Sequence, residues 1–298
     1  MTESKPTAPP RIAPAGLMFL AITSLGWGST WPANKFLLGE LPPLTLRGGT
    51  GIAGAVLLAL MALSQAQSLK VERHLWPRLL LSALLNVTGW MSMMGLALTY
   101  LSASEAVLIA YTMPVWASLL AWPVLGERPT WLRAMALVMA FAGLAVIAGG
   151  NGISATAAKW PGIAMALVGA IGFGLGTVLA KRLPVPLPPI PAAAWQVGLG
   201  CLPVLLLGLA FETAHIERVT TLGCWLLLYT TVSQFCIAYV SWFAALARLP
   251  ASIAAIGTMA APVIGVVTSA IALGEPLGVT QIAALAFTLG GVVLATRT

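Results

Sequence analysis

Two related stretches decide the fold of this chain: LSASEAVLIAYTMPVWASLLAWPVLGE at residues 101–127 and LPASIAAIGTMAAPVIGVVTSAIALGE at residues 249–275. They belong to an internal repeat with an offset of 148 residues. That offset superposes Leu101, Ala103, Ser104, Ala106, Pro114, Leu125, Gly126, Glu127 and Gly143 on Leu249, Ala251, Ser252, Ala254, Pro262, Leu273, Gly274, Glu275 and Gly291. Nearer the front, an offset of 146 superposes Gly16, Gly26, Gly28 and Lys35 on Gly162, Gly172, Gly174 and Lys181. The chain therefore contains two copies of one unit, with a small insertion between the two registers.

The composition around these stretches indicates a membrane protein. Of 298 residues, 59% are hydrophobic and 8% are charged, and the mean hydropathy is +0.95. An ordinary soluble domain carries about 25% charged residues. Uncharged apolar runs that reach about 18 to 20 residues are typical of transmembrane helices. We therefore expect an all-α integral membrane protein.

Breaks at Pro, Gly and charged residues divide the chain into ten predicted transmembrane helices. Their predicted ranges are 15–38, 43–64, 75–99, 102–122, 129–149, 160–182, 190–211, 220–247, 250–273 and 277–296. The connections are short, so little chain remains for a soluble domain. We interpret residues 1–14 as a polar tail ahead of an uncleaved first helix, because no small-residue cleavage site ends that helix.

The basic residues predict the orientation of these helices. With the N-terminus inside, the cytoplasmic side holds Lys5, Arg11, Lys70, Arg73, Arg78, Arg128, Arg133, Lys181, Arg182, Arg248 and Arg297. The other side holds Lys35, Arg47, Lys159 and Arg218. Cytoplasmic loops keep the excess of Lys and Arg. Both termini are therefore predicted to be cytoplasmic, in a multi-pass plasma membrane protein of the bacterial inner membrane type.

Each copy contains an odd number of predicted helices, five, so the second copy enters the bilayer from the side opposite to the first. The predicted repeats are residues 15–150 and 151–298. Inverted repeats of this kind place a binding site at their interface near the midplane and give two related packings that open to either side. This arrangement is the main argument from sequence for transport.

Several motifs in this repeat resemble one known family. The first half carries Gly26-Trp27-Gly28-Ser29, Lys35, Pro42-Pro43, Arg47, Ala103-Ser104, Pro114 and Leu125-Gly126-Glu127-Arg128, and the second repeats Ala251-Ser252, Pro262 and Leu273-Gly274-Glu275. The pattern resembles the EamA-type branch of the drug/metabolite transporter superfamily, and the aromatic content resembles its YddG-type exporters of aromatic amino acids and organic cations. The resemblance implies ten helices, a central cavity and export by alternating access. The proline-rich stretch after Lys181-Arg182 departs from the first repeat, so the connection there need not copy it.

Polar and aromatic residues at mid-depth are the candidate substrate-binding residues. Trp27 and Trp31 share one face of the first helix with Lys35, and we expect the lysine to snorkel towards the interface. The tryptophans either line a cavity or pack between helices. Asn86 and Trp90 share a face of the third helix, where the amide contacts either substrate or a neighbouring helix.

Two further helices supply candidates of the same kind. In the eighth helix Gln234 is the expected cavity residue, whereas Tyr239 and Trp242 lie on a different flank in an ideal helix and are expected to pack. Phe173, in the sixth helix, corresponds to Trp27.

Pro114 and Pro262 are the candidate hinges. They interrupt the fourth and ninth predicted helices at equivalent positions, because proline lacks the backbone N–H and clashes with the preceding turn. Matched interruptions point to a binding site or hinge, although a packing kink is the alternative. The residues that cluster at these breaks complete the candidate site: Tyr111, Thr112, Trp116, Thr258 and Met259.

The candidate lining suits neutral or zwitterionic solutes. Indoles, a phenol, amides and a thioether fix no strong charge, which favours amino acids, especially aromatic ones, and aromatic cations through cation–π contact. We find no Arg or Lys pair at depth for a sugar phosphate or nucleotide. Glu105 is the sole candidate for proton coupling, and a facilitative or weakly coupled mechanism is expected.

Other functions fit the sequence less well. The chain lacks the GxSxG, HExxH and acidic-dyad motifs of enzymes, and its three cysteines lack CxxC spacing, so we expect no catalysis, no metal and no cofactor. The net charge of +7 is not clustered, which argues against nucleic acid as a partner. The expected partners are a small-molecule substrate and the lipid bilayer. A channel, or a multidrug or other-metabolite permease of the same superfamily, remains the alternative, and the sequence leaves the oligomeric state open.

Overall fold

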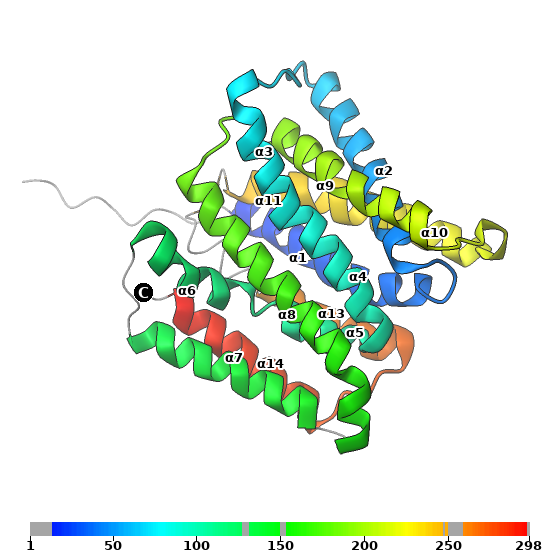
Figure 1. Ribbon diagram of the computed structural model, residues 1–298, viewed down its shortest axis with the longest axis vertical. Coiled ribbons are helices and arrows are strands. Elements are labelled where there is room, and N and C mark those ends of the chain that lie inside the picture. Colours follow the sequence, from blue (N-terminus) through cyan, green and yellow to red (C-terminus); the bar gives the residue numbers. More distant parts are fainter. Residues whose placement is uncertain (1–13, 127–130, 150–152, 247, 250–258, 297–298) are drawn as a thin grey trace, which may run out of the picture.

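The computed structural model describes residues 14–126, 131–149, 153–246, 248–249 and 259–296, and every regular element within these ranges is helical. The elements are α1 (Pro14–Leu37), α2 (Pro43–Ser64), η1 (Arg73–Leu75), α3 (Trp76–Ala83), η2 (Leu84–Gly89), α4 (Trp90–Tyr100), α5 (Ala103–Ala110), α6 (Met113–Leu125), α7 (Trp131–Gly149), α8 (Ile153–Arg182), α9 (Pro189–Phe211), η3 (Ile216–Arg218), α10 (Thr221–Thr230), η4 (Thr231–Ile237), α11 (Ala238–Leu246), α13 (Ala260–Leu273) and α14 (Val279–Thr296). Figure 1 shows them as one helical assembly.

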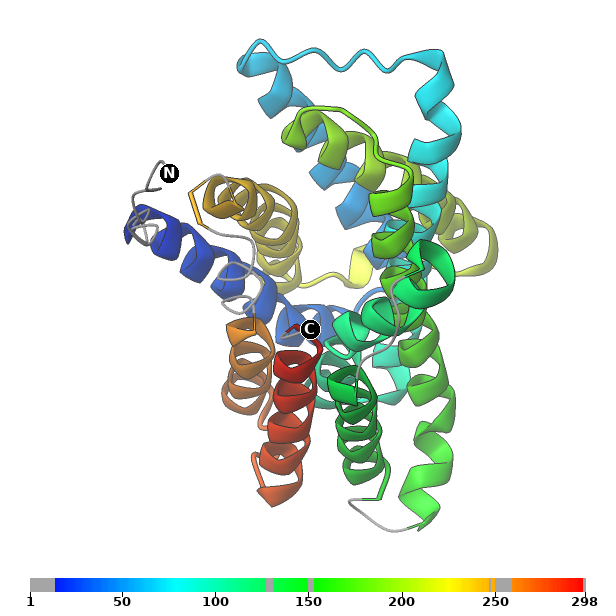
Figure 2. The same ribbon diagram turned by 90° about the vertical axis from the view of Figure 1, so that its left-hand side faces the viewer.

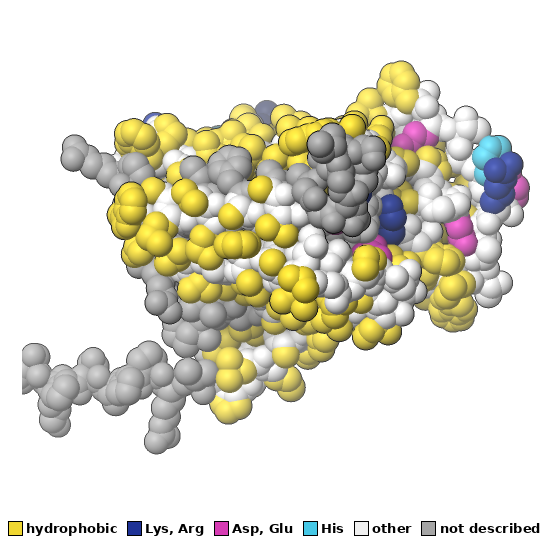
Figure 3. Space-filling view, turned by 90° about the horizontal axis from the view of Figure 1, so that it is seen from below, with side chains coloured by type: hydrophobic (Ala, Val, Ile, Leu, Met, Phe, Trp, Pro, Cys, Tyr) yellow, Lys and Arg dark blue, Asp and Glu magenta, His cyan; other side chains and the backbone are white. Residues whose placement is uncertain are grey.

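Six helical segments of the described chain are long and apolar enough to cross a membrane. They are Pro43–Ser64, Arg73–Tyr100, Ala103–Leu125, Ala157–Arg182, Pro189–Phe211 and Thr221–Ala245, and Ala260–Leu273 and Val279–Gly291 are shorter apolar helices. Figure 3 shows hydrophobic side chains over much of one face, with charged and histidine side chains gathered towards one end. Large apolar side chains such as Leu60, Val138 and Leu206 point outward. Apolar side chains of this kind can face lipid. The backbone is compatible with lipid as well, because helices satisfy their own backbone hydrogen bonds. The count of ten transmembrane helices stays a prediction.

The predicted interruption of the fourth segment is present. Helix α5 ends at Ala110 and α6 begins at Met113, so Tyr111 and Thr112 lie between them and Pro114 is the second residue of α6. A proline is tolerated in the first turn of a helix, where its missing N–H leaves no intrahelical bond unmade. Pro262 is correspondingly the third residue of α13. The chain before Met259, including the candidate Thr258, lies outside the described residues.

Two segments contain π-helical turns that the sequence analysis did not anticipate. Residues 84–89 form η2 within the third segment, and residues 231–237 form η4 within the eighth. Adding the repeat offset of 148 to the first range gives 232–237, which falls inside the second. Such turns hold one residue more than an α-helical turn and occur often at functional sites.

Helices from the two halves pack in a reciprocal pattern. Helix α2 packs against α9 and α7 against α14, and the α7–α14 pair is visible in both Figure 1 and Figure 2. The α1–α13 contact has its counterpart in the α8–α6 contact, and α1–α11 has its counterpart in α8–α4. Each contact therefore recurs when the corresponding helices of the two halves are exchanged.

Glycines set the close approach of α2 and α9. A Cβ atom at Gly48 would lie 2.4 Å from the backbone nitrogen of Leu205, and one at Gly208 would lie 2.6 Å from that of Thr45. Small residues allow helix backbones to meet this closely in membranes. The α2–α9 pair forms one wall of the cavity described next.

Candidate functional site

A cavity of about 370 Å³ lies among the helices of both halves. Its size falls within the range of small-molecule binding sites, about 300 to 1,000 Å³. Its lining comes from α1, α2, the third segment, α8, α9 and the eighth segment, together with Tyr111 and Met113 at the α5–α6 break. Seven of the predicted site residues line it: Trp27, Trp31, Asn86, Trp90, Tyr111, Phe173 and Gln234.

The other described candidates near the proline breaks, Thr112, Trp116 and Met259, are not part of the cavity lining. Thr112 is buried and donates its hydroxyl to the Ile109 carbonyl, and it accepts a hydrogen bond from the indole Nε1 of Trp116 at 3.0 Å. Met259 is the N-cap residue of α13, which begins at Ala260. Helical spacing placed these residues near the break without showing which of them turn inward.

Aromatic rings make up much of the cavity wall. The rings of Trp90 and Phe173 lie 5.1 Å apart, centroid to centroid. Trp27 lies edge-on to Tyr239 at 5.8 Å and tilted against Trp242 at 5.9 Å. These distances fall within the range of favourable aromatic pairs. The wall therefore offers flat apolar surfaces held in fixed relative orientations.

Two amides in the lining occupy corresponding places in the two halves. Asn86 lies in η2 and Gln234 in η4, and they are separated by the repeat offset of 148. Asn86 donates from Nδ2 to the Ser82 hydroxyl at 3.2 Å, while its Oδ1 is buried without a hydrogen-bond partner. A Cβ atom at Gly176 would lie 2.1 Å from this oxygen, so the glycine makes room for the amide.

The expectation that Tyr239 and Trp242 lie away from the cavity is wrong. Both line the cavity together with Gln234. The prediction assumed 3.6 residues per turn through the eighth helix, whereas η4 is π-helical, with hydrogen bonds from residue i to i+5. The wider turn rotates everything after it, so that Gln234 and Tyr239, five residues apart, both face the cavity.

One cation that the sequence did not mark as a site residue lies in the cavity wall. Arg47, assigned to the non-cytoplasmic side as an orienting charge, is 6% exposed and lines the cavity. It is the fifth residue of α2, and its side chain reaches across Gly95 of α4, where a Cβ atom would lie 2.9 Å from the arginine Cγ. Thr30, Asn34 and Gln196 also line the cavity and were not among the predicted site residues. Each is a polar residue within an apolar helix, which is the signal that could have identified them.

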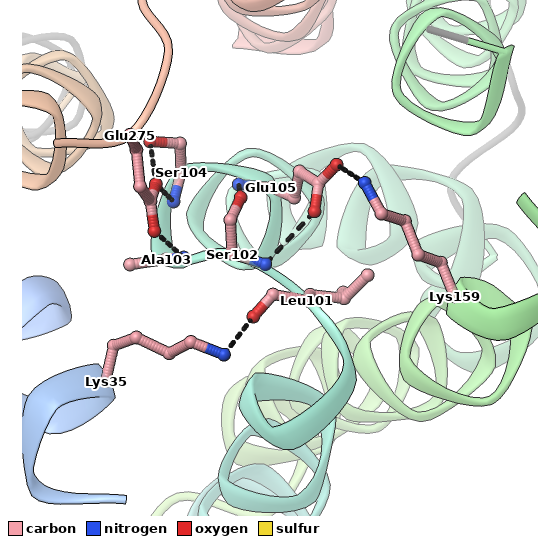
Figure 4. Close-up of polar contacts among 8 residues, drawn as sticks. All are labelled: Lys35, Leu101, Ser102, Ala103, Ser104, Glu105, Lys159 and Glu275. Carbon is pink, nitrogen blue, oxygen red and sulfur yellow. Dashed lines mark hydrogen bonds and ion pairs between the residues drawn. The ribbon is translucent and has the colours of Figure 1, made fainter. Parts of the chain in front are cut away.

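Lys35 contacts the turn between α4 and α5. Its Nζ donates to the carbonyl oxygens of Leu98 and Leu101, the latter at 2.7 Å. Figure 4 shows the ammonium directed at the turn between α4 and α5. These carbonyls belong to the end of α4, where the last carbonyls of a helix lack intrahelical partners and attract a cation.

Glu105 lies at this same turn and not in the cavity lining. Its carboxylate accepts from the backbone N–H of Ser102 at 3.0 Å, and the Ser102 hydroxyl accepts from the backbone N–H of Glu105, which together form a capping box. The carboxylate also pairs with Lys159 of α8 at 2.5 Å (Figure 4). From the opposite side, Glu275 accepts hydrogen bonds from Ala103 and Ser104.

The lining is extended along the helices. Arg47 lies in the second turn of α2 and Leu98 near the end of α4, whereas Ala180 lies near the end of α8, Gln196 in the first half of α9 and Phe243 in the second half of α11. Under the predicted orientation, the first set is nearer the outer surface and the second nearer the cytoplasm. Arg47 is the sole charged side chain among the described residues of this lining.

Apolar membrane-length helices around a cavity lined by rings and amides define a multi-pass membrane protein built to hold a small molecule. Comparison with known proteins agrees with this class. The model of the EamA-like transporter family matches residues 14–149 and again residues 160–297, and the chain therefore belongs to that family. It is a small-molecule transporter embedded in the membrane.

Individual relatives match over most of the chain. The uncharacterized transporter YvbV of Bacillus subtilis is 31% identical over 90% of this chain and 87% of its own length. A probable terminal-alkyne amino-acid exporter of Streptantibioticus cattleyicolor is 28% identical over 93% of this chain and 92% of its own. A solved crystal structure at 20% identity covers 95% of this chain and 96% of its own, with a TM-score of 0.69, and shares the fold.

Proposed function

We propose that this protein exports amino acids, including aromatic ones, from the cytoplasm by alternating access around the cavity. In this proposal the chain forms ten transmembrane helices as two inverted repeats, residues 15–150 and 151–298, with both termini in the cytoplasm of a bacterial inner membrane. The proposed cargo also includes aromatic cations, because indole and phenol faces attract them. Pro114 and Pro262 act as hinges in this scheme.

The observation that carries the proposal is the correspondence of Asn86 and Gln234. Both amides sit on π-helical turns, both line one cavity, and the repeat offset relates them. The reciprocal contacts, such as α1–α13 with α8–α6, support a two-fold relation between the halves. A cavity built from two related halves can open to either side when the halves exchange their conformations.

The chemistry of the lining supports the choice of substrate. The paired rings of Trp90 and Phe173, and of Trp27 and Tyr239, suit a flat apolar body. Amide groups suit the polar end of an amino acid. The relative from Streptantibioticus cattleyicolor, named as a probable exporter of an amino acid, points the same way.

The lining also supports a facilitative or weakly coupled mechanism. None of its described residues is Asp, Glu or His, which are the groups that relay protons in many transporters. Glu105, the candidate for coupling, is held in a capping box and an ion pair with Lys159.

Transport in liposomes tests the proposal. The purified protein should take up labelled tryptophan, phenylalanine and leucine down their gradients, and unlabelled substrate on the far side should accelerate uptake of the label. A channel shows no such acceleration, so this counterflow measurement separates it from a carrier. Absence of uptake for the whole panel of amino acids, in protein that remains folded, would remove the proposed substrate class.

A further inference from the structure

Arg47 is a buried cation in the wall of the cavity. It lies in the second turn of α2 with 6% of its surface exposed, and it lines the cavity alongside Asn34 and Trp90. A charge in the membrane interior is costly unless it is paired or hydrogen-bonded. The group that pairs with the Arg47 guanidinium therefore indicates the function of this residue.

The described residues supply no carboxylate to this guanidinium. Each of their six glutamates is engaged elsewhere: Glu40 with Thr220, Glu72 with His74, Glu105 with Lys159, Glu212 with Leu44 and Thr45, Glu217 with His215, and Glu275 with Ala103 and Ser104. The Nε atom of Arg47 is itself buried without a hydrogen-bond partner. The cavity thus presents a desolvated positive charge with donor capacity to spare.

The surroundings hold the side chain in place. Gly95 leaves the space that the arginine stem occupies, since a Cβ atom there would lie 2.9 Å from the arginine Cγ. Asn34 donates from Nδ2 to the Thr30 carbonyl at 2.7 Å, which leaves its buried Oδ1 without a partner in the same lining. An unpartnered donor and an unpartnered acceptor in one cavity are the two groups that a zwitterion requires.

We infer that Arg47 binds the carboxylate of the transported solute, so that the cargo is a monocarboxylate with an apolar or aromatic body, of which an α-amino acid is the simplest form. A guanidinium matches a carboxylate through two parallel N–H···O bonds. Only one cation is present in the described lining, which suits one negative charge and leaves the second charge of a phosphate monoester unpaired. The inference deepens the proposed function and rests on it for the identity of the cargo.

Matched acid and amide ligands test this inference by binding alone. The pairs are tryptophan with tryptophanamide, leucine with leucinamide, and indole-3-propionate with indole-3-propionamide, measured by calorimetry on the purified full chain in detergent. The third pair lacks the amine and isolates the carboxylate. The wild type should bind each acid about 30-fold more tightly than its amide, because losing one partner of a buried charge pair is that costly.

Substitution of the arginine should remove this preference. Arg47→Gln should weaken the acids about 30-fold and leave the amides within about threefold, while Arg47→Lys should keep part of the preference through its remaining charge. Arg218→Gln removes a charge from the turn η3, outside the cavity, and is the matched control. If Arg47→Gln weakens acids and amides equally, or if the wild type does not prefer the acids, the inference is overturned.

A second variant keeps the test informative if Arg47→Gln does not fold. Gly95→Ala places a methyl group against the arginine stem and keeps the charge, so it should weaken the acids selectively. An equal effect on acids and amides would contradict the inference. Carboxylate binding through Arg47 without any amino acid flux in liposomes would contradict the proposed function and leave this inference standing. Amino acid flux in liposomes together with an unchanged preference for acids in Arg47→Gln would overturn this inference and leave the proposed function standing.

Discussion

The carboxylate of Glu275 accepts hydrogen bonds from the backbone N–H and the hydroxyl of Ser104, two residues that lie 171 positions apart in the chain. It also accepts from the N–H of Ala103 at 2.7 Å. These groups open helix α5, whose first N–H groups have no intrahelical partner. An acidic residue following α13, in the second half of the chain, therefore caps a helix of the first half.

Glu275→Gln should lower the free energy of unfolding by about 1–2 kcal/mol, because it removes a charge and weakens the cap at a helix N-terminus. Melting of the purified protein in detergent measures the change. Glu217→Gln is the control, since Glu217 is exposed and contacts His215 within its own turn. Equal loss of melting temperature in both variants would show that the Glu275 contact does not hold the halves together.

Gly48→Ala should destabilise the protein by about 1–3 kcal/mol, because an added methyl group would press on the backbone of Leu205 and force α2 away from α9. The neighbouring Gly49 provides the matched control, since a Cβ atom there meets nothing within 4 Å. Gly49→Ala should leave the melting temperature unchanged or raise it, as alanine favours the helix. Two variants of similar stability would contradict the packing described for these helices.

Gln234→Leu and Asn86→Leu should each reduce amino acid uptake in liposomes about tenfold at unchanged melting temperature. Each change removes one polar contact to a solute, which corresponds to about 1.4 kcal/mol. Thr99→Val, at an exposed position outside the cavity lining, is a control of similar chemistry. Unaffected uptake in both amide variants would remove the cavity as the transport site.

Trp90→Ala should discriminate between substrates. The indole packs against Phe173 in the cavity wall, and an aromatic pair adds about 0.5–1.5 kcal/mol beyond its buried area. We expect the half-saturation concentration for tryptophan to rise about tenfold while that for alanine changes little. An equal rise in the half-saturation concentration for both amino acids would show that the Trp90 ring has a structural role and does not select the substrate.

Glu105→Gln tests the coupling mechanism. If uptake is facilitative, the variant should respond to a pH gradient as the wild type does, although its melting temperature should fall because the ion pair with Lys159 is lost. A variant that loses pH-driven uptake and keeps downhill flux would defeat the uncoupled mechanism. The measurement is the rate of uptake into liposomes with and without an imposed pH gradient.

Hydropathy and helix breakers located several of the helices closely, because both signals act locally. Helix α2 spans the predicted residues 43–64, and α9 begins one residue before its predicted start. Tyr239 escaped prediction because a π-helical turn changes the helical phase without any marker in the sequence. Arg47 escaped because a basic residue near a helix end reads as an orienting charge, and only the tertiary packing of α2 against α4 turns it inward.

The π-helical turns also bear on the origin of the chain. Such a turn arises when one residue is added to an α-helix, and here both halves carry the addition at matching places. If the two halves descend from one duplicated unit, a single insertion before the duplication would account for both turns. That ancestral product would have enclosed a chamber only by pairing with an identical molecule. Ala193 is the fifth residue of α9, as Arg47 is the fifth residue of α2. At this position the two halves would then have diverged, so that a chamber that was symmetrical now carries a charge on one side only.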